Sequence, residues 1–264
     1  MEILVCVKQV PDDSVEIHLK DGAPDFSQAA PVVNAFDTYA LEMAVRLKES
    51  VGGNVTVLSV GPETAKNSLK NCLAVGASKA FLVPEEQYQQ MDSNGIGIVL
   101  KGAIEKIEEM EGVAYDVIFC GRESTDYASG QVGPALAKQL NVGLVTNIVD
   151  IEQSGDGVIA KQETEEGYHK VETKMPCVVT VNKPVYDPRY PTIKSKMAAR
   201  KIAIGEIALT DLQVTEKEMI DGNSIKVCNV YEPAKKEAGV KIKSETLEEA
   251  VAQVFSMMEE AKVL

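Results

Sequence analysis

The sequence predicts an α/β protein with a mostly parallel, doubly wound sheet, two projecting hairpins and a C-terminal helical arm. Two observations lead to this fold class. Short apolar runs alternate with segments of helical period through residues 1–150, which is typical of parallel strands joined by crossover helices. In addition, 45% of the 264 residues are apolar, enough for the core of one α/β unit with an extension.

Five strands and four helices are expected in this alternating part. Each expected strand is an apolar run of strand length: Ile3–Val10, Val55–Val60, Ala80–Val83, Val117–Gly121 and Gly143–Val149. Each expected helix has apolar residues at helical spacing: Phe36–Lys48, Glu63–Val75, Gly97–Met110 and Val132–Leu140. Because most strands are followed by a helix, neighbouring strands should run parallel.

Two hairpins interrupt the alternation. Residues Val15–Leu19 alternate with period two and meet Asp21-Gly22, a dipeptide that favours tight turns. Segments Gly157–Gln162 and Tyr168–Thr173 predict a second hairpin. The apolar run Cys177–Val181 follows it and predicts a buried strand of the sheet.

The composition changes after this strand. Three prolines between residues 184 and 191 predict a rigid loop, and the basic residues from 194 to 201 predict a short basic helix. Residues 202–243 are polar and irregular, whereas residues 246–263 regain a helical period with an apolar stripe. We therefore expect an α/β domain at residues 1–202, which includes a loop at 181–203, and a C-terminal extension at residues 203–264 ending in the helix 246–263.

The charge balance excludes several kinds of partner. The formal net charge is −13, from 27 lysines and arginines against 40 aspartates and glutamates. Binding to polyanions depends on clustered lysine and arginine, so nucleic acid and anionic membrane surfaces are poor candidates. No apolar run reaches the roughly 18 residues that a membrane span needs. We expect no membrane insertion and a cytoplasmic location.

Side chains for common catalytic or metal sites are scarce. The five cysteines are widely spaced and form no C-x-x-C pair, so they are expected to be buried and reduced. With two histidines, His18 and His169, and no nucleophile motif, we expect neither a metal site nor hydrolytic machinery. Any chemistry should therefore come from a bound molecule.

Three unusual segments follow expected strands, at the ends where ligands bind in open parallel sheets. They are Lys8–Asp12, Ser59–Pro62 and Gly121–Pro134. The longest is rich in glycine and hydroxyl side chains, which let a backbone approach phosphate, and it contains Arg122. These features favour a nucleotide site over a loop that only turns the chain, although neither standard glycine fingerprint is present.

Helix caps are the alternative role for some of these residues. Ser129 can cap the helix that follows the long loop, and Pro134 suits the first turn of that helix. Before the first helix, Asn34 or Asp37 can act as an N-cap or as part of the site. The residue types alone leave both readings open for these two positions.

Seven motifs lie in order within residues 1–202. They are Val7–Asp12, Asn34–Glu42, Ala44–Lys48, Gly61-Pro62, Ala74–Ala77, Gly121–Gly133 and Asp187–Thr192. Together they resemble the beta subunit of electron-transfer flavoprotein. The resemblance implies an adenine-nucleotide-binding α/β fold and a heterodimer with the alpha subunit of that family.

Carried over residue by residue, the resemblance implies cofactor contacts at strand ends, at the start of the first helix and in the long loop. These positions are Cys6, Val60, Asn34, Ala35, Phe36, Asp37, Gly121, Arg122, Glu123, Ser124, Thr125, Asp126, Ser129, Gly130, Gln131 and Val132. Arg122 is the candidate for electrostatic contact with a flavin or a phosphate.

The resemblance also implies that residues 181–203 form a recognition loop for a flavin-dependent dehydrogenase. The docking segment within it is Pro188, Arg189, Tyr190, Pro191, Thr192 and Ile193. Ile193 stands where the family usually places a leucine in a pocket of the partner, so its volume is kept and its branching is changed. The alternative is that Ile193 folds back onto its own domain.

Family members bind either AMP or a second FAD in the beta subunit. Thr125-Asp126 and Ser129–Pro134 resemble the branch with FAD, which takes hydride from NADH and divides the electrons. One acceptor is ferredoxin or flavodoxin, and the other is an acyl-CoA or 2-hydroxy-acid dehydrogenase, reached through the alpha-subunit FAD. The alternatives are a non-bifurcating subunit with structural AMP and a non-redox nucleotide-binding regulator. Because flavin supplies the redox chemistry, no catalytic side chain is expected, and calling the subunit an enzyme is a matter of definition.

Overall fold

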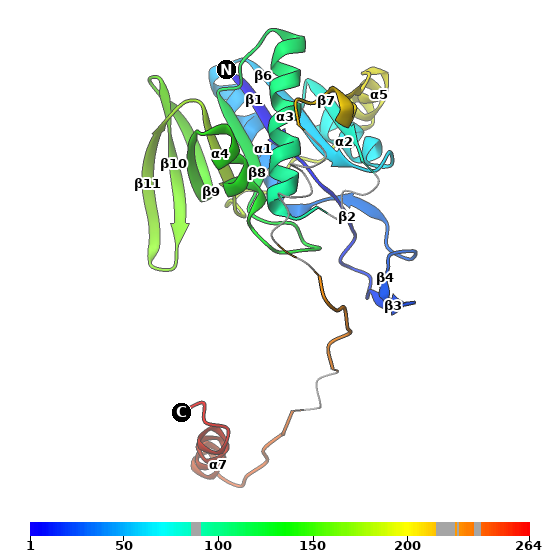
Figure 1. The fold of residues 1–264 in the computed structure, drawn as a ribbon. Coiled ribbons are helices and arrows are strands. Elements are labelled where there is room, and N and C mark those ends of the chain that lie inside the picture. The colour runs from blue at the N-terminus through cyan, green and yellow to red at the C-terminus, as the bar shows by residue number, and fades with distance from the viewer. Residues whose placement is uncertain (86–90, 215–224, 226, 235–238) are drawn as a thin grey trace. The chain divides into compact units, whose positions relative to one another are not determined.

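The computed structural model describes residues 1–85, 91–214, 225, 227–234 and 239–264 (Figure 1). These residues divide into two compact units, Met1–Cys228 and Asn229–Leu264. The first unit contains a nine-stranded sheet in the order β11-β10-β9-β12-β8-β1-β6-β7-β13. Its strands are β1 (Glu2–Cys6), β6 (Asn54–Gly61), β7 (Lys79–Pro84), β8 (Val117–Gly121), β9 (Gly143–Ser154), β10 (Gly157–Thr164), β11 (Gly167–Lys174), β12 (Cys177–Val181) and β13 (Gly205–Glu206).

The sheet is mostly parallel, as the sequence predicts. Neighbouring strands pair in parallel in the order β9-β12-β8-β1-β6-β7-β13. At the β9 edge, β10 and β11 add an antiparallel hairpin. This hairpin forms the edge opposite α2 and α5 in Figure 1. The prediction of an α/β protein with projecting hairpins is therefore confirmed.

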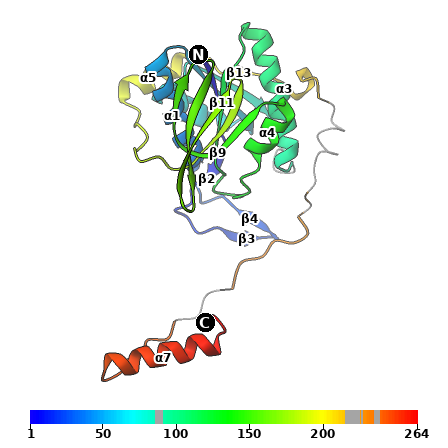
Figure 2. The same cartoon turned by 90° about the vertical axis from the view of Figure 1, so that its left-hand side faces the viewer.

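Helices cover both faces of the sheet (Figure 2). Successive strand residues point to opposite faces, so Leu4 packs in the core beneath α3 and α4, and Val5 packs in the core beneath α1, α2 and α5. The helices are α1 (Ala35–Val51), α2 (Ala65–Val75), α3 (Ser93–Glu111), α4 (Val132–Leu140) and α5 (Ile193–Lys201).

All four helices predicted in the alternating part are present, and three of them begin or end at other residues than predicted. α4 begins and ends at the predicted residues. α3 begins at Ser93, earlier than the predicted Gly97, because the Asp92 side chain accepts hydrogen bonds from the main-chain N–H groups of Asn94 and Gly95 and caps the helix there.

The first predicted strand, Ile3–Val10, is wrong at its carboxyl end. β1 ends at Cys6, and β2 (Gln9–Pro11) instead pairs with β5 (Pro31–Val33) in a separate small sheet. The physical reason lies at Lys8. Its N–H donates to Asp37 (2.7 Å) and its carbonyl accepts from the N–H of Asn34 (2.9 Å), so its main chain leaves the ladder.

Both predicted hairpins are present. β3 (His18–Lys20) and β4 (Ala23–Asp25) are joined by Asp21-Gly22, whose positive φ angles of 52° and 80° suit a tight hairpin turn. β10 and β11 form the second hairpin. β9 runs to Ser154, further than the predicted Val149, because it pairs antiparallel with β10 up to the turn between them.

Part of the stretch expected to be irregular belongs to the sheet and its core. β13 pairs with β7, and Ile207 and Leu212 are buried, on either side of a short 3₁₀ turn at Leu209–Asp211. Residues 215–224, 226 and 235–238 of that stretch lie outside the described residues. The division of the chain at residue 202 stays a prediction.

The second unit contains the expected C-terminal helix, α7 (Leu247–Glu260). Thr246 caps it by accepting a hydrogen bond from the N–H of Glu249 (3.3 Å). No side chain of α7 is buried, and its apolar residues Leu247, Val251 and Val254 are exposed.

None of the five cysteines forms a disulfide. Four are buried as expected, whereas Cys228 is exposed, because it follows the last elements of the sheet and has exposed neighbours on both sides. In the part of the chain that the structure describes, no three histidine, cysteine or carboxylate side chains cluster as metal ligands would, and no helix has the length and hydropathy to cross a membrane.

Candidate functional site at the carboxyl edge of the sheet

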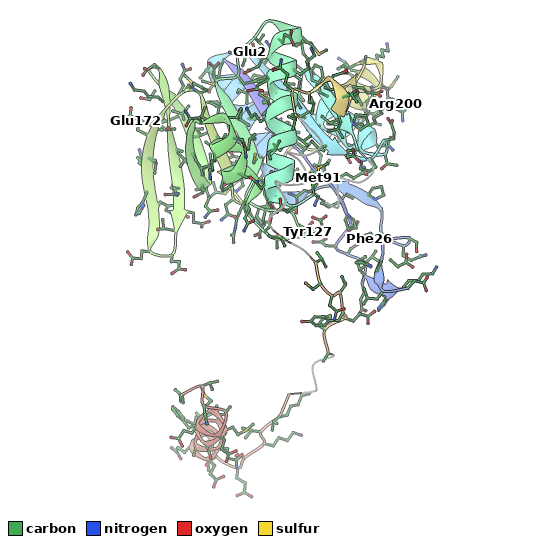
Figure 3. All side chains as sticks on the ribbon, in the orientation of Figure 1. Glu2, Phe26, Met91, Tyr127, Glu172 and Arg200 are labelled. Carbon is green, nitrogen blue, oxygen red and sulfur yellow. The ribbon has the colours of Figure 1, made fainter. Side chains whose placement is uncertain are left out.

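The carboxyl ends of β6, β1, β8 and β12 lie side by side, because these strands are parallel neighbours. The three segments that the sequence singles out follow β1, β6 and β8, so the fold brings them to this one edge. Figure 3 shows Tyr127, in the loop after β8, at the end of the sheet opposite Glu2, where β1 begins. We call this region the carboxyl edge.

Asn34 connects the start of α1 with the long loop. Its side chain is fully buried, and its amide nitrogen donates to the carbonyl of Glu123 (2.8 Å) while its amide oxygen accepts from the N–H of Thr125 (3.1 Å). Its side chain therefore does not cap α1, although its backbone occupies the N-cap position. A buried amide with both ends bonded fixes the course of the loop.

Asp37 joins the ends of two strands. Its carboxylate is buried and accepts hydrogen bonds from the N–H of Lys8 after β1 (2.7 Å) and the N–H of Gly121 at the end of β8 (3.2 Å). Only glycine fits at position 121, since a Cβ there would lie 2.3 Å from the Asp37 carboxylate. Burial raises the pKa of Asp37 to about 7, although these N–H groups, the Asn34 side chain and the charge of Lys8 lower it.

The rest of the long loop is tied at two further points. The Lys8 ammonium contacts both carboxylate oxygens of Asp126 at 2.7 and 2.8 Å and lies 5.2 Å from the ring centroid of Tyr127. The hydroxyls of Ser129 and Ser93 are hydrogen-bonded at 3.0 Å. The prediction that Ser129 caps α4 is wrong, because Gln131 occupies the N-cap position and Ser129 bonds across to the start of α3.

Three helices begin at the carboxyl edge without a side-chain cap. The N-cap residues of α1, α2 and α4 are Asn34, Thr64 and Gln131, and none caps its helix through its side chain. By contrast, Asp92 caps α3 and Thr192 caps α5. At α2 the N–H groups of Ala65, Lys66 and Asn67 already donate to carbonyls of the preceding turn. Because the first N–H groups of a helix lack intrahelical partners, the termini of α1 and α4 offer main-chain donors and a partial positive charge to an anion.

α4 starts close to the sheet because of Gly133. A Cβ at this position would lie 2.4 Å from the Thr180 methyl carbon on β12. The next residue, Pro134, lies in the first turn of α4 as predicted. Gly133 therefore allows the N–H groups of the first turn to lie directly over the end of β12.

The other predicted cofactor positions lie at the same edge. Cys6 and Val60 are buried in the core beneath α3 and α4, and the Cys6 thiol is hydrogen-bonded to that of Cys120, which raises its pKa together with burial. Arg122 has a 45% exposed side chain whose Nε lies 3.9 Å from the Glu123 carboxylate. The remaining positions, exposed or partly buried, are Ala35, Phe36, Ser124, Gly130 and Val132.

Two side chains that hold the site were not among the predicted site residues. Lys8 lies in the segment that the sequence singles out after the first strand, so its position in the chain was a usable signal. Ser93 is 36 residues from Ser129 and stands in an ordinary polar stretch. Only the fold brings these two serines together.

The docking segment is attached to α1 rather than to the long loop. Arg189 contacts Glu42 and Glu49 on α1, whereas Tyr190 and Ile193 are 90% and 82% exposed. Thr192 caps α5 by accepting from the N–H of Ser195 (3.1 Å). The structure thus separates two groups of predicted residues, one at the carboxyl edge and one at the start of α5.

A doubly wound sheet with uncapped helix N-termini at its carboxyl edge defines the class of α/β ligand-binding proteins. Comparison with known proteins narrows the class. The profile described as "Electron transfer flavoprotein domain" matches residues 27–212. The chain therefore belongs to the electron transfer flavoprotein family and, within it, to the beta subunits, as its motifs predict.

Full-length relatives show the same assignment. The chain is 35% identical to the "Electron transfer flavoprotein subunit beta" of Thermoanaerobacterium thermosaccharolyticum and 33% identical to that of Megasphaera elsdenii, each over 100% of both chains. It is 32% identical to the "Acryloyl-CoA reductase electron transfer subunit gamma" of Anaerotignum propionicum, over 98% of both chains.

Proposed function

We propose that the chain is the beta subunit of a bifurcating electron-transfer flavoprotein, acts in the cytoplasm and binds FAD at the carboxyl edge. NADH is the electron donor, ferredoxin or flavodoxin is one acceptor, and a flavin-dependent dehydrogenase, reached through the FAD of the alpha subunit, is the other. The observation that supports this most is the long loop, held by Asn34 and Lys8 beside the uncapped N-termini of α1 and α4.

The residues at the carboxyl edge fit a nucleotide with phosphate groups. The N–H groups of Val132 and Gly133 would bind phosphate oxygens, and Arg122 would add positive charge, since its ion pair with Glu123 is long, at 3.9 Å. Cys6 and Val60 would provide an apolar wall. When bound, FAD supplies the hydride and single-electron chemistry, and the chain's own groups bind it and fix its orientation.

The nucleotide content of the purified heterodimer tests this proposal. After co-expression with its alpha subunit, two FAD per heterodimer are expected. One FAD and one AMP would instead indicate the non-bifurcating subunit, and a chain without partner or visible absorption would indicate the non-redox regulator. Arg122→Gln should lower nucleotide retention, whereas Arg200→Gln, an exposed arginine on α5, should not.

The docking segment is proposed to bind the dehydrogenase through Ile193, supported by its 82% exposure beside Tyr190 and Met197. The matched control is Val185, an apolar residue of the same loop that is 96% exposed. Ile193→Ala should slow reduction of an acyl-CoA dehydrogenase from the same organism and leave nucleotide content unchanged, while Val185→Ala should change neither. Equal rates for Ile193→Ala and the wild type would remove Ile193 as the anchor.

The exposed apolar stripe of α7 supports a role in assembly. We propose that α7 packs against the alpha subunit or the dehydrogenase. The name of the Anaerotignum relative favours a dehydrogenase that acts on an acyl-CoA. Deletion of residues 240–264 should weaken copurification of one of these proteins. If assembly is intact and only the isolated subunit loses stability, α7 packs on its own chain instead.

A further inference from the structure

Arg189 is turned inward, toward α1, although it lies in the docking segment. Its main-chain N–H and its Nε both donate to the same Glu42 oxygen at 3.1 and 2.8 Å, and its Nη2 donates to the other at 3.2 Å. Its Nη1 and Nη2 also donate to Glu49 at 2.6 and 3.0 Å. The guanidinium group thus bridges the carboxylates of Glu42 and Glu49, which are about two helical turns apart on α1.

Glu42 is the fixed point of this contact. Its side chain is 3% exposed and also accepts from Arg46 Nε at 2.7 Å. Burial alone would raise its pKa, but the hydrogen bonds from Arg189 and Arg46 outweigh burial and hold the pKa below its usual range. Glu42 is therefore charged at neutral pH and needs its two arginine partners.

A second residue of the loop is attached to the same helix. The Arg46 guanidinium lies 3.9 Å from the ring centroid of Tyr186, a stacking distance for a cation over an aromatic ring. The chain between Tyr186 and Arg189 is consequently held at both ends by α1.

α5 is held at its far end as well. Lys70 of α2 donates to the carbonyls of Ala199 (3.2 Å), Arg200 (3.4 Å) and Ile202 at the C-terminal end of α5. A cation at this end also complements the helix dipole. Between the two attachments, Ile193 and Met197 remain exposed.

We propose that Arg189 is a positioning residue of the docking segment: its guanidinium fixes where Ile193 stands and does not itself contact the partner. The proposal rests on the proposed docking function. Four of the five guanidinium N–H groups donate to Glu42 or Glu49, which leaves one N–H of Nη1 to offer a partner. The planar fork of arginine is needed, because the ammonium of lysine is a point charge and cannot bridge two carboxylates in this geometry.

Hydrogen exchange of the intact heterodimer tests the attachment without any dehydrogenase. In Arg189→Lys and Glu49→Gln, the main-chain amide of residue 189, which donates to Glu42, should exchange at least about tenfold faster, since the hydrogen bonds to charged groups that hold it there are lost. The matched control is Glu109→Gln, an exposed glutamate of α3 paired with Lys106 at 2.8 Å. Unchanged exchange in Arg189→Lys would overturn the proposal.

Electron transfer to the acyl-CoA dehydrogenase distinguishes positioning from direct contact. Arg189→Lys should raise the KM for the dehydrogenase about tenfold with kcat and nucleotide content unchanged. In this background Ile193→Ala should add little, because Ile193 is already displaced. Fully additive losses would show that Arg189 contacts the partner and would overturn the proposal. If the wild type reduces no dehydrogenase, the proposed function fails, and hydrogen exchange still decides the role of Arg189.

Discussion

At the carboxyl edge, the groups that would face a ligand are main-chain N–H groups, and buried side chains such as Asn34 and Asp37 hold them from inside. In the docking segment, the groups that would face a partner are side chains, and Arg189 holds the backbone by bonding inward to α1. The comparison indicates that the edge is sensitive to changes of buried polar groups and of volume. The docking segment should instead be sensitive to surface charge and to the shape of one side chain.

The pH dependence of stability should separate the two regions most strongly, through Asp37. Burial raises the pKa of Asp37 from its ordinary 3.8 to about 7, so the folded chain binds a proton more tightly than the unfolded chain. The contribution of Asp37 to stability is therefore full below about pH 4 and is lost as pH rises to 7, by about 4 kcal/mol. Urea unfolding of the wild type and Asp37→Asn between pH 4 and 8 measures it. A difference between the two that does not vary with pH would contradict the prediction.

Asn34→Ala should cost about 3 kcal/mol of unfolding free energy, because the Glu123 carbonyl and the Thr125 N–H lose their buried partner. It should also lower nucleotide retention, since the loop is released. Asn54→Ala is the control, because Asn54 is exposed and bonded to the Glu2 side chain at the amino ends of β6 and β1, away from the carboxyl edge. Denaturant unfolding and nucleotide quantification of both variants provide the comparison. Similar losses in the two variants would mean that the buried amide has no special role.

Gly133→Ala should cost about 2 kcal/mol, because its new methyl group would overlap the Thr180 methyl carbon and push α4 away from the sheet. Because the first turn of α4 is displaced, Gly133→Ala should also retain less nucleotide. The double variant Gly133→Ala/Thr180→Ser should recover most of the lost stability and of the lost nucleotide. Serine keeps the hydroxyl that accepts from the N–H of Asn147 (3.0 Å) and removes the methyl group. Thermal unfolding of the three proteins decides it, and no recovery in the double variant would refute the steric explanation.

Thr192→Ala should have the smallest effect, a loss of about 1 kcal/mol, as for other N-cap threonines. The effect should be confined to the start of α5, with nucleotide content unchanged and faster exchange of the Ser195 amide. Thr192→Ser keeps the capping hydroxyl and should resemble the wild type. A loss of nucleotide in Thr192→Ala would show that the two regions are coupled more closely than their separate attachments indicate.

Much of the fold was predictable because strand and helix periods depend on local residue order. α4 was predicted to the residue, and the turn at Asp21-Gly22 follows from residue type alone. The end of β1 was not predictable, because Lys8 leaves the ladder to bond with Asn34 and Asp37, more than 25 residues further along.

The position of the candidate site was predictable, but the roles of its side chains were only partly so. Strand ends identify the edge, and the family motifs identify the loop. The partners of Asn34 are 89 and 91 residues away, so its choice between capping α1 and bridging the loop depends on tertiary structure. The sequence likewise marks Arg189 as a charged loop residue and does not reveal that it turns toward α1.

α1 bears both attachments, Asp37 near its start and Glu42 and Glu49 further along. An α-helix turns by about 100° per residue, so one residue inserted between Asp37 and Glu42 would swing one attachment away from its partner. Point substitutions on the exposed side of α1 leave this spacing intact, whereas a change of length does not. Alignments of relatives should therefore be free of gaps across residues 34–49, while the exposed turn at residues 165–166 can vary in length.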